Sequence, residues 1–428
     1  MAIIGGGIAG LTAAAYLARA GQTVTVFEKA HTLGGRARTE TKQGFAFNFG
    51  PHALYRNGAG VKILRELGVE FSGKINSTDG AFALDNGARH TMPGGFVSLL
   101  TTGLMNLPAK LEAAKLLASL PKLETTPLDS LTVREWLARE VKQPKVAQLV
   151  QALFRVSTYA NDPARQSAGA ALRQFQMALS GGVYYLDNGW QTMVNGLRAV
   201  AEQAGATIQT DASVTAIEQN TSGFVIHFAN GKSLLAASVI IAASPTETAA
   251  LVKSNETLAN WARTMIPVRT ACLDVALTHL PEPHARFGLG IDQPYYFSVH
   301  SATAKLAPDN GAMIHVAKYL PPASRENSGE NAQTIEQELE QVFDLLQPGW
   351  RKTVVARRFL PRMTVTNALV TAANGGIRPG PTVPGSKGLY VAGDWVGNEG
   401  QLVDASFASG KAAAEIIVQQ AHAVAAAA

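Results

Sequence analysis

Apolar residues near the N-terminus fall into short runs that are separated by glycines. The run at 2–4 predicts a buried strand, the alanine-rich stretch that ends near residue 20 predicts a helix, and the run at 23–27 predicts a second buried strand. A strand, a helix and a strand in this order predict a βαβ unit with a parallel sheet. A secretory signal peptide needs a basic segment before its apolar core, but the first cation here is Arg19, so we expect no such signal.

The glycines between the first strand and the helix follow the pattern Gly5-x-Gly7-x-x-Gly10. Gly5 allows a tight exit from the strand, Gly7 lets the backbone approach a pyrophosphate, and Gly10 lets the helix pack closely on the strand. The free N–H groups of the first helical turn favour an anion. Glu28 ends the second strand, where its carboxylate can accept hydrogen bonds from a ribose. These features predict a dinucleotide site, and a glycine turn in an ordinary α/β core is the simpler alternative.

The C-terminal region also combines a short apolar run with glycines and a long helical pattern. Residues 389–392 predict a buried strand, Gly393 and Asp394 predict a turn, and residues 402–420 predict a helix after a glycine-bearing loop. We expect the alanine tail beyond this helix to be a frayed end.

The middle of the chain is helical in its first half and strand-like in its second. Residues 96–177 have a mostly helical pattern, in which Thr132 and Glu135 have the spacing of a capping box. Asn-Gly pairs inside alternating segments predict hairpins. The other predicted elements are hairpins at Asn86-Gly87 and Asn230-Gly231, a helix at 60–67, a buried strand at 238–242, and strands within 269–277, 295–301 and 311–320.

Length and composition favour a protein of two domains with a large core. The chain has 428 residues, of which 46% are hydrophobic and 16% charged, so we expect no extensive disorder. Cys272 is the only cysteine, which excludes an internal disulfide and a cysteine metal cluster and fits a reducing compartment. No apolar run approaches the ~18 residues of a membrane span. We therefore expect a soluble, cytoplasmic protein.

The positive charge is modest and dispersed. The net charge is +5, and Lys and Arg alternate with Asp and Glu without a dense basic run. The sequence therefore gives no support for nucleic-acid binding. An acidic lipid or an acidic substrate stays open, as does a peripheral membrane contact.

A second glycine pair follows Glu28 in the stretch "HTLGGRARTE", which continues to "FNFGPHALYR". Here the sequence resembles the FAD-dependent oxidoreductases of the amine oxidase, protoporphyrinogen oxidase and phytoene desaturase superfamily, and is most similar to bacterial phytoene desaturase-like proteins. The resemblance implies that FAD is the cofactor and that Gly34, Gly35 and Arg36 lie against its diphosphate and ribityl chain. Glycines allow backbone amides to reach a cofactor, and a guanidinium complements phosphate charge. The sequence departs from the resemblance at Thr32, two residues before the glycine pair, where many relatives have a basic residue.

The stretch "GLYVAGDWVGNEGQLVDASF" resembles the C-terminal flavin segment of the same superfamily. The resemblance implies that Gly393 and Asp394 hold the ribityl or diphosphate region, and that Gln401 and Leu402 bring a helix N-terminus to the flavin. A positive helix end stabilises the charge of reduced flavin. The resemblance also implies that Val214 contacts the adenine through its backbone.

The expected fold class is α/β, with a Rossmann-type FAD-binding domain and a discontinuous α+β substrate or cap domain. We assign residues 1–75, 186–245 and 365–428 to the FAD-binding domain. Residues 76–185 and 246–364 are assigned to the cap, whose helices and sheet should form the walls of a substrate pocket beside the flavin.

Few side chains are candidates for a part in catalysis, because the flavin itself accepts the hydride. His52 follows a Gly-Pro turn expected near the flavin, so it is either a proton acceptor or a structural residue. Trp190 and Trp395 lie near cofactor segments and are candidates to line the pocket, although packing explains them as well. His300 and His315 are isolated, and we interpret them as core or surface residues. We expect no metal, because no ligand cluster is spaced for one.

Several functions are compatible with this resemblance. The first is hydride removal from a C–H, CH–CH or CH–NH unit of a lipophilic small molecule, as in a desaturase or dehydrogenase. An amine oxidase is disfavoured because the lysine that such enzymes place near the flavin aligns with Leu273, where Arg269 is the only nearby cation. A flavin-dependent isomerase or mutase is a further alternative, as is a cofactor-less escort-type binding protein. The cofactor-less escort-type protein is disfavoured because the cofactor residues are intact, namely Gly7, Glu28, Gly34, Gly35 and Asp394. The substrate, the electron acceptor and the oligomeric state stay open.

Overall fold

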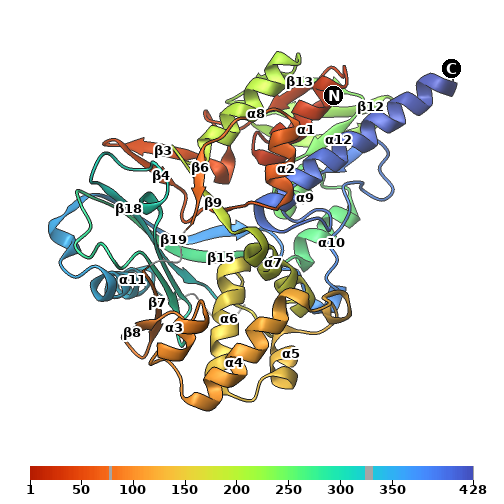
Figure 1. Ribbon diagram of the computed structural model, residues 1–428. Coiled ribbons are helices and arrows are strands. Elements are labelled where there is room, and N and C mark those ends of the chain that lie inside the picture. The colour runs from red at the N-terminus through yellow and green to blue at the C-terminus, as the bar shows by residue number, and fades with distance from the viewer. Residues whose placement is uncertain (77–79, 323–330, 428) are drawn as a thin grey trace.

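The computed structural model describes residues 1–76, 80–322 and 331–427. In Figure 1 the first and last segments of the chain lie together in one part of the molecule, and segments from the middle of the sequence form the other part. The predicted class, α/β with a parallel sheet and a second α+β part, is confirmed by the two main sheets.

The first part is built on a five-stranded parallel sheet with the order β10-β2-β1-β14-β20. One face is covered by helices that bury their alanine- and leucine-rich sides against it, and α1 packs on both α8 and α12. The strands are β1 (Ala2–Ile4), β2 (Thr25–Phe27), β10 (Thr207–Gln209), β14 (Val239–Ile241) and β20 (Leu389–Val391), and the helices are α1 (Ile8–Arg19), α2 (Ala59–Glu66), α8 (Gln191–Gln203) and α12 (Leu402–Ala427). The predicted βαβ unit is therefore correct, although β2 begins at Thr25 instead of residue 23.

A three-stranded antiparallel sheet packs on the other face of the parallel sheet. Its strands are β11 (Val214–Asn220), β12 (Gly223–Phe228) and β13 (Ser233–Ala236), so the hairpin expected at Asn230-Gly231 is confirmed. Val252, the C-cap of α9 (Pro245–Leu251), and Leu258 of α10 (Glu256–Thr264) belong to the same core. The domain division stays a prediction, but this packing favours a boundary after Thr264 over one at residue 246.

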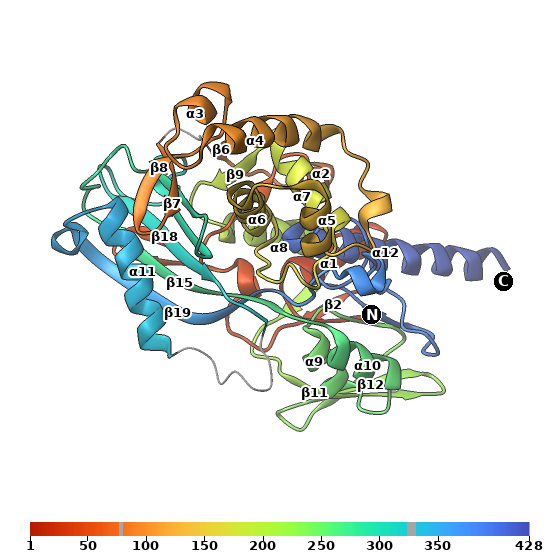
Figure 2. The ribbon, with the colours of Figure 1, turned by 90° about the horizontal axis from the view of Figure 1, so that it is seen from below.

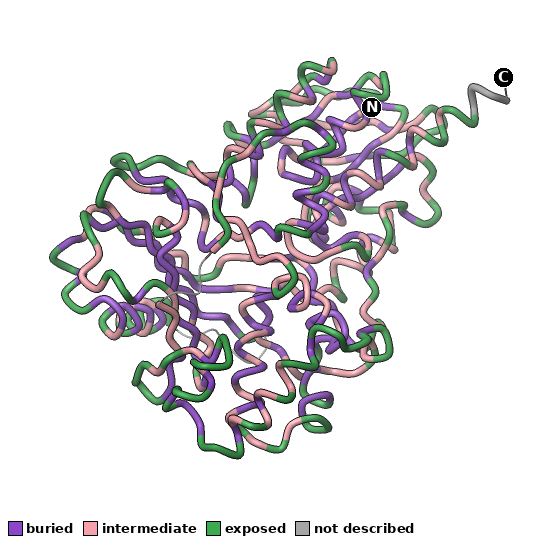
Figure 3. Tube along the Cα trace, in the orientation of Figure 1, coloured by how far each residue is buried: buried purple, intermediate pink, exposed green. Residues whose placement is uncertain are grey.

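The second part contains a seven-stranded sheet with the order β19-β15-β18-β17-β16-β7-β8. Its strands are β7 (Ala81–Asp85), β8 (Ala88–Thr91), β15 (Val268–Leu277), β16 (Phe287–Gly290), β17 (Tyr295–Val299), β18 (Ala312–Tyr319) and β19 (Val354–Thr366). Along β15, Leu273 and Val275 pack against α11 (Ala332–Leu346), whereas Val268 and Cys272 face the opposite side. Both faces are covered, and Figure 3 shows the buried residues that result along these strands.

The face of this sheet opposite α11 is covered by helices of the region predicted to be helical (Figure 2). The helices that share a core with the sheet are α3 (Phe96–Thr101), α4 (Leu107–Ser119) and α6 (Pro144–Thr158). Helices α5 (Val133–Glu140) and α7 (Ala168–Gly181) pack on α6 in a second layer. Thr132 and Glu135 form the expected capping box at α5. Between the two parts lie two small sheets, made of β3 (Thr39–Lys42) with β4 (Phe45–Asn48), and of β5 (Leu54–Tyr55), β9 (Val183–Leu186) and β6 (Gly73–Ile75).

The C-terminal helix differs from its prediction. It continues to Ala427 instead of ending near residue 420, because alanine has the highest helix propensity and the tail consists largely of alanine. Among the described residues, no helix is both long and apolar enough to cross a membrane.

Candidate cofactor and active site

A cavity of about 940 Å³ lies at the carboxyl ends of the parallel strands. In sheets of this type a ligand binds at that edge. The cavity is lined by segments that are far apart in sequence, and these include Gly5, Gly7, Glu28, Gly34, Gly35, Arg36, His52, Trp190, Val214, Gly393, Asp394 and Leu402. The structure thus brings most of the predicted site residues to one place. Gly10, Trp395 and Gln401 do not line it.

The glycines after β1 leave room for a ligand at the start of α1. Gly5 has a φ of +110°, and a Cβ there would lie 2.5 Å from the carbonyl oxygen of Ala242. A Cβ at Gly10 would lie 2.0 Å from the carbonyl oxygen of Gly5, which agrees with a packing role. Gly7 is the N-cap of α1, and no side chain caps the helix. Its first N–H groups are therefore available to an anion such as a diphosphate.

Glu28 is held in place by the backbone. Its two carboxylate oxygens accept hydrogen bonds from the amides of Gly6 at 2.7 Å and Ala30 at 2.8 Å. The side chain is only 9% exposed and lines the cavity. A fixed carboxylate at this end of β2 has the position and the acceptor capacity that a ribose needs.

The second glycine pair packs directly on the first glycine cluster. The amide of Gly34 donates to the carbonyl of Gly6 at 2.8 Å, and Gly34 and Gly35 both have positive φ angles. This turn directs Arg36 across the cavity, where its Nη1 atom lies 2.6 Å from a carboxylate oxygen of Asp394. Asp394 is 2% exposed. The two regions that the sequence assigned to one cofactor are thus joined by an ion pair.

The loop between β20 and α12 is fixed by a residue that the sequence did not reveal. Arg378 is buried and donates to the carbonyls of Asp394 at 3.2 Å, Gly397 at 2.7 Å and Gly400 at 2.6 Å. Burial lowers the pKa of Arg378 to about 10, so its guanidinium stays charged at neutral pH. Its partners lie 16 to 22 residues away, a spacing that no local pattern signals.

The start of α12 is strained and anchored from outside the cavity. Leu402 has a φ of +56° and lines the cavity. Gln401 donates to the carbonyl of Ala170 on α7 at 2.8 Å, so it connects the loop to the cap helices and does not itself reach the cavity. Asp404 in the first turn accepts from the amide of Gly60 at 2.7 Å, and its other oxygen has no partner. Burial raises the pKa of the Asp404 carboxyl to about 7.

His52 lies at the cavity, but its ring nitrogens are both next to backbone carbonyls. Nδ1 lies 2.9 Å from the oxygen of Gly50 and Nε2 lies 3.0 Å from the oxygen of Arg36. Burial lowers the pKa of His52 to about 4, so the ring is neutral and donates to one carbonyl at a time. Its edge packs on Trp190 with ring centroids 4.4 Å apart. This geometry favours the structural interpretation over a proton acceptor.

Trp190 and Trp395 differ in position. Trp190 lines the cavity, and its Nε1 atom is buried without a partner. Trp395 is fully buried, donates to the carbonyl of Ala243 at 2.9 Å and packs on Trp261. The structure therefore places Trp395 in the core behind the cavity and not on its wall.

The alignment that assigned the lysine position to Leu273 does not match the structure. Leu273 points to the α11 side of the sheet, away from the cavity, while the neighbouring Thr270 and Cys272 lie on the other face. None of these is a lysine. In the part of the chain that the structure describes, Lys29 is the one lysine that lines the cavity, next to Glu28.

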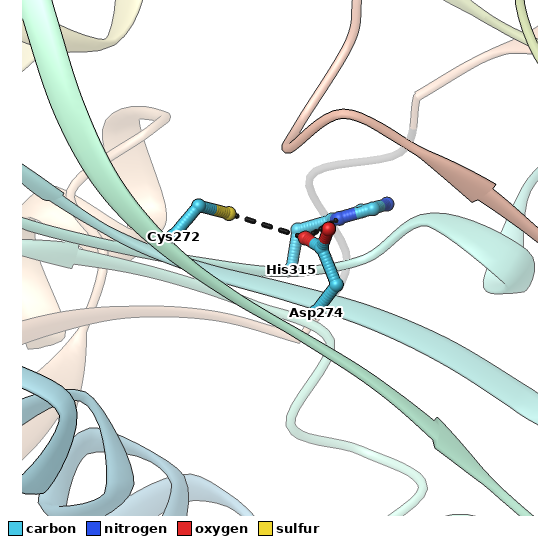
Figure 4. A group of neighbouring side chains, drawn as sticks. All are labelled: Cys272, Asp274 and His315. Carbon is cyan, nitrogen blue, oxygen red and sulfur yellow. Dashed lines mark hydrogen bonds and ion pairs between the residues drawn. The ribbon is translucent and has the colours of Figure 1, made fainter. Parts of the chain in front are cut away.

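His315 is not isolated, because the sheet brings it into a buried polar network with Cys272 and Asp274 (Figure 4). Asp274 accepts from Cys272 at 3.1 Å and lies 2.6 Å from Nδ1 of His315. Its other oxygen pairs with Arg358 at 2.7 Å. Burial acts to raise the pKa of Asp274, but His315 and Arg358 outweigh it and leave that pKa lowered.

The network contains the residue types of a metal site, which the sequence spacing did not suggest. Two features favour a hydrogen-bonded network instead. The guanidinium of Arg358 already pairs with Asp274, and burial raises the pKa of the Cys272 thiol well above its usual range. A thiol binds metal as the thiolate, so this cysteine is a poor ligand.

The fold and the cavity define an α/β protein with a dinucleotide-type site and a second, α+β part. The sequence matches the family described as flavin containing amine oxidoreductases over residues 8–418, and the chain belongs to that family. Its cofactor is FAD, in agreement with the resemblance found in the sequence. The glycine turns, the uncapped start of α1 and the fixed Glu28 all fit such a group.

Curated relatives include enzymes that act on carotenoids. The chain is 26% identical over 263 residues to a carotenoid 3,4-desaturase of Haloarcula japonica, a match that covers 54% of this chain and 52% of the desaturase. It is 49% identical over 51 residues to a 4,4'-diapophytoene desaturase of Staphylococcus aureus, which covers 12% of this chain and 10% of that enzyme. The chain thus matches about half the length of the first relative and a tenth of the second.

Solved structures share the whole fold at low sequence identity. An oxidoreductase from Methanosarcina mazei has a TM-score of 0.75 at 19% identity and covers 97% of this chain and 99% of its own. Cyclohexylamine oxidase from Brevibacterium oxydans has a TM-score of 0.71 at 17% identity and covers 98% of this chain and 99% of its own. At these identities the likeness concerns the fold.

Proposed function

We propose that this protein is an FAD-dependent oxidoreductase that removes hydride from a C–H, CH–CH or CH–NH unit of a lipophilic small molecule, in the manner of a desaturase or dehydrogenase. The observation that carries the proposal is the meeting of both cofactor signatures, through Arg36 and Asp394, at a cavity that adjoins an apolar and aromatic cluster. The desaturase relatives support this choice of chemistry.

The residues around the cavity divide into three groups in this proposal. Glu28 and Val214 would hold the adenosine end of FAD. Gly7, Gly34, Gly35 and Arg36 would hold the diphosphate, whose charge the guanidinium would offset. Gly393, Asp394 and Leu402 would contact the ribityl and flavin end, and Gln401 fixes their loop on α7.

When bound, the flavin would accept the hydride, and the side chains of the protein would orient the substrate and exclude water. Tyr159 lines the cavity and belongs to the apolar cluster beside it. Its hydroxyl donates to the carbonyl of Pro51 at 3.0 Å, and burial keeps its pKa well above the usual value, so it holds its proton. Tyr159 therefore fixes the 50–52 turn at the wall of the cavity. His52 remains a candidate for contact with the flavin through the face or edge of its neutral ring, because both ring nitrogens lie next to backbone carbonyls.

The absence of a cavity lysine on the described cap strands supports a desaturase over an amine oxidase that uses the lysine route. A flavin-dependent isomerase or mutase would use the same cofactor residues and differ in returning the electrons to its product. An escort-type binding protein would have no use for them.

The spectrum of the purified protein tests the proposal. We expect flavin absorption, FAD in the supernatant after denaturation, and anaerobic bleaching by a lipophilic CH–CH donor. Bleaching by amines alone would favour the amine oxidase. If neither kind of donor bleaches the flavin and a lipophilic compound is instead isomerised, the isomerase or mutase is favoured. If the protein does not take up FAD, the escort-type binding protein is favoured.

We also propose that α3 and α4 contact a lipid surface. These neighbouring helices carry four large apolar side chains that are 64% to 75% exposed. Lys110 and Lys115 on α4 are the basic groups beside them, which suits an anionic lipid. The four apolar residues are Phe96, Val97, Leu107 and Leu111. A cytoplasmic location stays a prediction.

A further inference from the structure

Arg155 is a buried arginine in the cap that has no acidic partner among the residues that the structure describes. Arg155 on α6 is 8% exposed, and its Nη2 atom donates to the carbonyl of Gly290 at 3.0 Å. Its Nε atom is buried without a partner, and among the described residues no carboxylate pairs with it. Asp292 acts on its charge from a distance, but the Asp292 carboxylate accepts from the amides of Asn86 at 3.1 Å and Gln293 at 2.9 Å.

Arg155 lies close to the cofactor cavity. Tyr159, which lines the cavity, follows Arg155 by one helical turn, and its amide donates to the carbonyl of Arg155 at 2.7 Å. Tyr159 is the C-cap of α6 and follows its last residue, Thr158. The backbone of Arg155 is therefore about one helical turn before this residue of the cavity wall.

Two further polar groups without partners lie on the sheet beside this face of α6. Thr270 and Tyr319 are directly opposite each other on β15 and β18, so their side chains share one face of the sheet. Both hydroxyls are buried, and neither has a hydrogen-bond partner in the described part of the chain. Tyr319 packs edge-on against Tyr159 at 5.8 Å and is near enough to Arg155 for the charge of the guanidinium to act on its phenol.

The surroundings of these groups are apolar. Tyr159 and Tyr319 belong to a cluster with Val268, Leu289 and Leu369. A charged group buried in such surroundings without a partner is costly, and so is each unpaired hydroxyl. The burial of Arg155 accordingly lowers its pKa.

We propose that Arg155, with Tyr319, binds the carboxylate of the substrate, so that the substrate is a lipophilic carboxylic acid. A carboxylate accepts two hydrogen bonds from a guanidinium and a third from the phenol. The apolar body of the acid then lies along the cluster and past Tyr159 toward the flavin. This inference rests on the proposed function and specifies its substrate class.

Calorimetry with three matched ligands tests this proposal. Decanoate, 1-decanol and decylamine share one chain and differ in their end group. With the holoenzyme we expect decanoate to bind at least tenfold more tightly than decanol and decylamine. This preference should disappear in Arg155→Gln, be partly restored in Arg155→Lys and weaken in Tyr319→Phe. The control Arg139→Gln removes a charge from an exposed position on α5 and should keep the preference.

The proposal is overturned if decanoate binds no tighter than decanol, including the case in which neither binds. It is also overturned if Arg155→Gln keeps the preference, which would leave Arg155 as a structural partner of Gly290. If Arg155→Gln does not fold, the proposal is tested by the preference for decanoate over decanol in the native protein and by its weakening in Tyr319→Phe. The FAD content, measured separately, reports failure of the proposed function independently of ligand preference.

Discussion

The guanidinium of Arg36 lies 2.6 Å from the carboxylate of Asp394, although 358 positions of sequence separate the two residues. Asp394 also accepts from the amide of Asn367 at 3.2 Å and from its side chain at 3.0 Å. One buried carboxylate thus fixes the arginine of the first cofactor segment and the backbone that precedes the second. The cofactor site is held together by this residue.

Asp394→Asn should lower the affinity for FAD by about tenfold or more, because the hydrogen bonds of a charged buried group contribute ~1.5–3 kcal/mol each and Arg36 loses its anionic partner. The ratio of FAD to protein after extensive dialysis measures the effect. Asp211→Asn, at an exposed ion pair with His31, is the control and should retain FAD. Full retention of FAD in Asp394→Asn would contradict our placement of the flavin.

Gly7→Val should abolish FAD binding while the apoprotein still folds. Gly7 has a φ of −81°, which any residue adopts, and the nearest atom to an added Cβ is 4.0 Å away, so the side chain would enter the cavity. Cofactor content and the thermal midpoint of the apoprotein separate the two effects. Gly94→Ala, with nothing within 4 Å of its Cβ, is the control. A variant that binds FAD normally would show that the diphosphate lies elsewhere.

Asp404→Asn should change how stability depends on pH. Burial raises the pKa of Asp404 to about 7 from an unfolded value of about 3.9, so its contribution to stability is fully present below about pH 4 and is lost as the pH rises through 7. As the pH rises from about 4 to about 8, the free energy of unfolding of the native protein should therefore fall relative to that of Asp404→Asn. Denaturant titrations at several pH values measure it, with exposed Glu70→Gln as control. A difference that is constant with pH would refute the prediction.

Arg358→Met should destabilise the fold by about 3 kcal/mol, because it leaves the buried carboxylate of Asp274 without its cation. Arg351→Met, at an exposed ion pair, should cost less than about 1 kcal/mol. A chelator should leave the thermal midpoint of the native protein unchanged, since the network needs no metal. A drop in the midpoint with chelator, restored by zinc, would show that Cys272, Asp274 and His315 form a metal site.

The exposed faces of α3 and α4 should bind anionic vesicles. We expect co-sedimentation with vesicles of phosphatidylglycerol and phosphatidylcholine, and less binding to phosphatidylcholine alone. The double variant Phe96→Ser with Leu111→Ser should lose most of the binding. Leu235→Ser removes an equally exposed leucine on β13 and should bind as the native protein does. If the double variant binds vesicles as well as Leu235→Ser does, the membrane contact lies on another surface.

The sequence revealed those features whose signals are local. The glycines at 5, 7 and 10, the acid at 28 and the strand predicted within 269–277 depend on local patterns of a few residues. The structure places Gly5, Gly7 and Glu28 at one cavity, and β15 includes the predicted strand. Arg155, Arg378 and Asp404 gave no such signal, because their environments are created by segments brought together only in the fold. Trp395 shows the reverse case, in which nearness in sequence to a cofactor segment did not bring its side chain to the cavity.

The packing of α1 against α12 has a consequence for biosynthesis. A ribosome releases the N-terminal residues first, yet the parallel sheet lacks an outer strand, and α1 lacks much of its cover, until residues 389–427 have emerged. Contacts between such distant segments form slowly because a long loop must close. The nascent chain therefore exposes an apolar face until α12 has been synthesised, and stable loading of FAD must follow the synthesis of this helix. Truncation within α12 should yield protein that aggregates before it can acquire its cofactor.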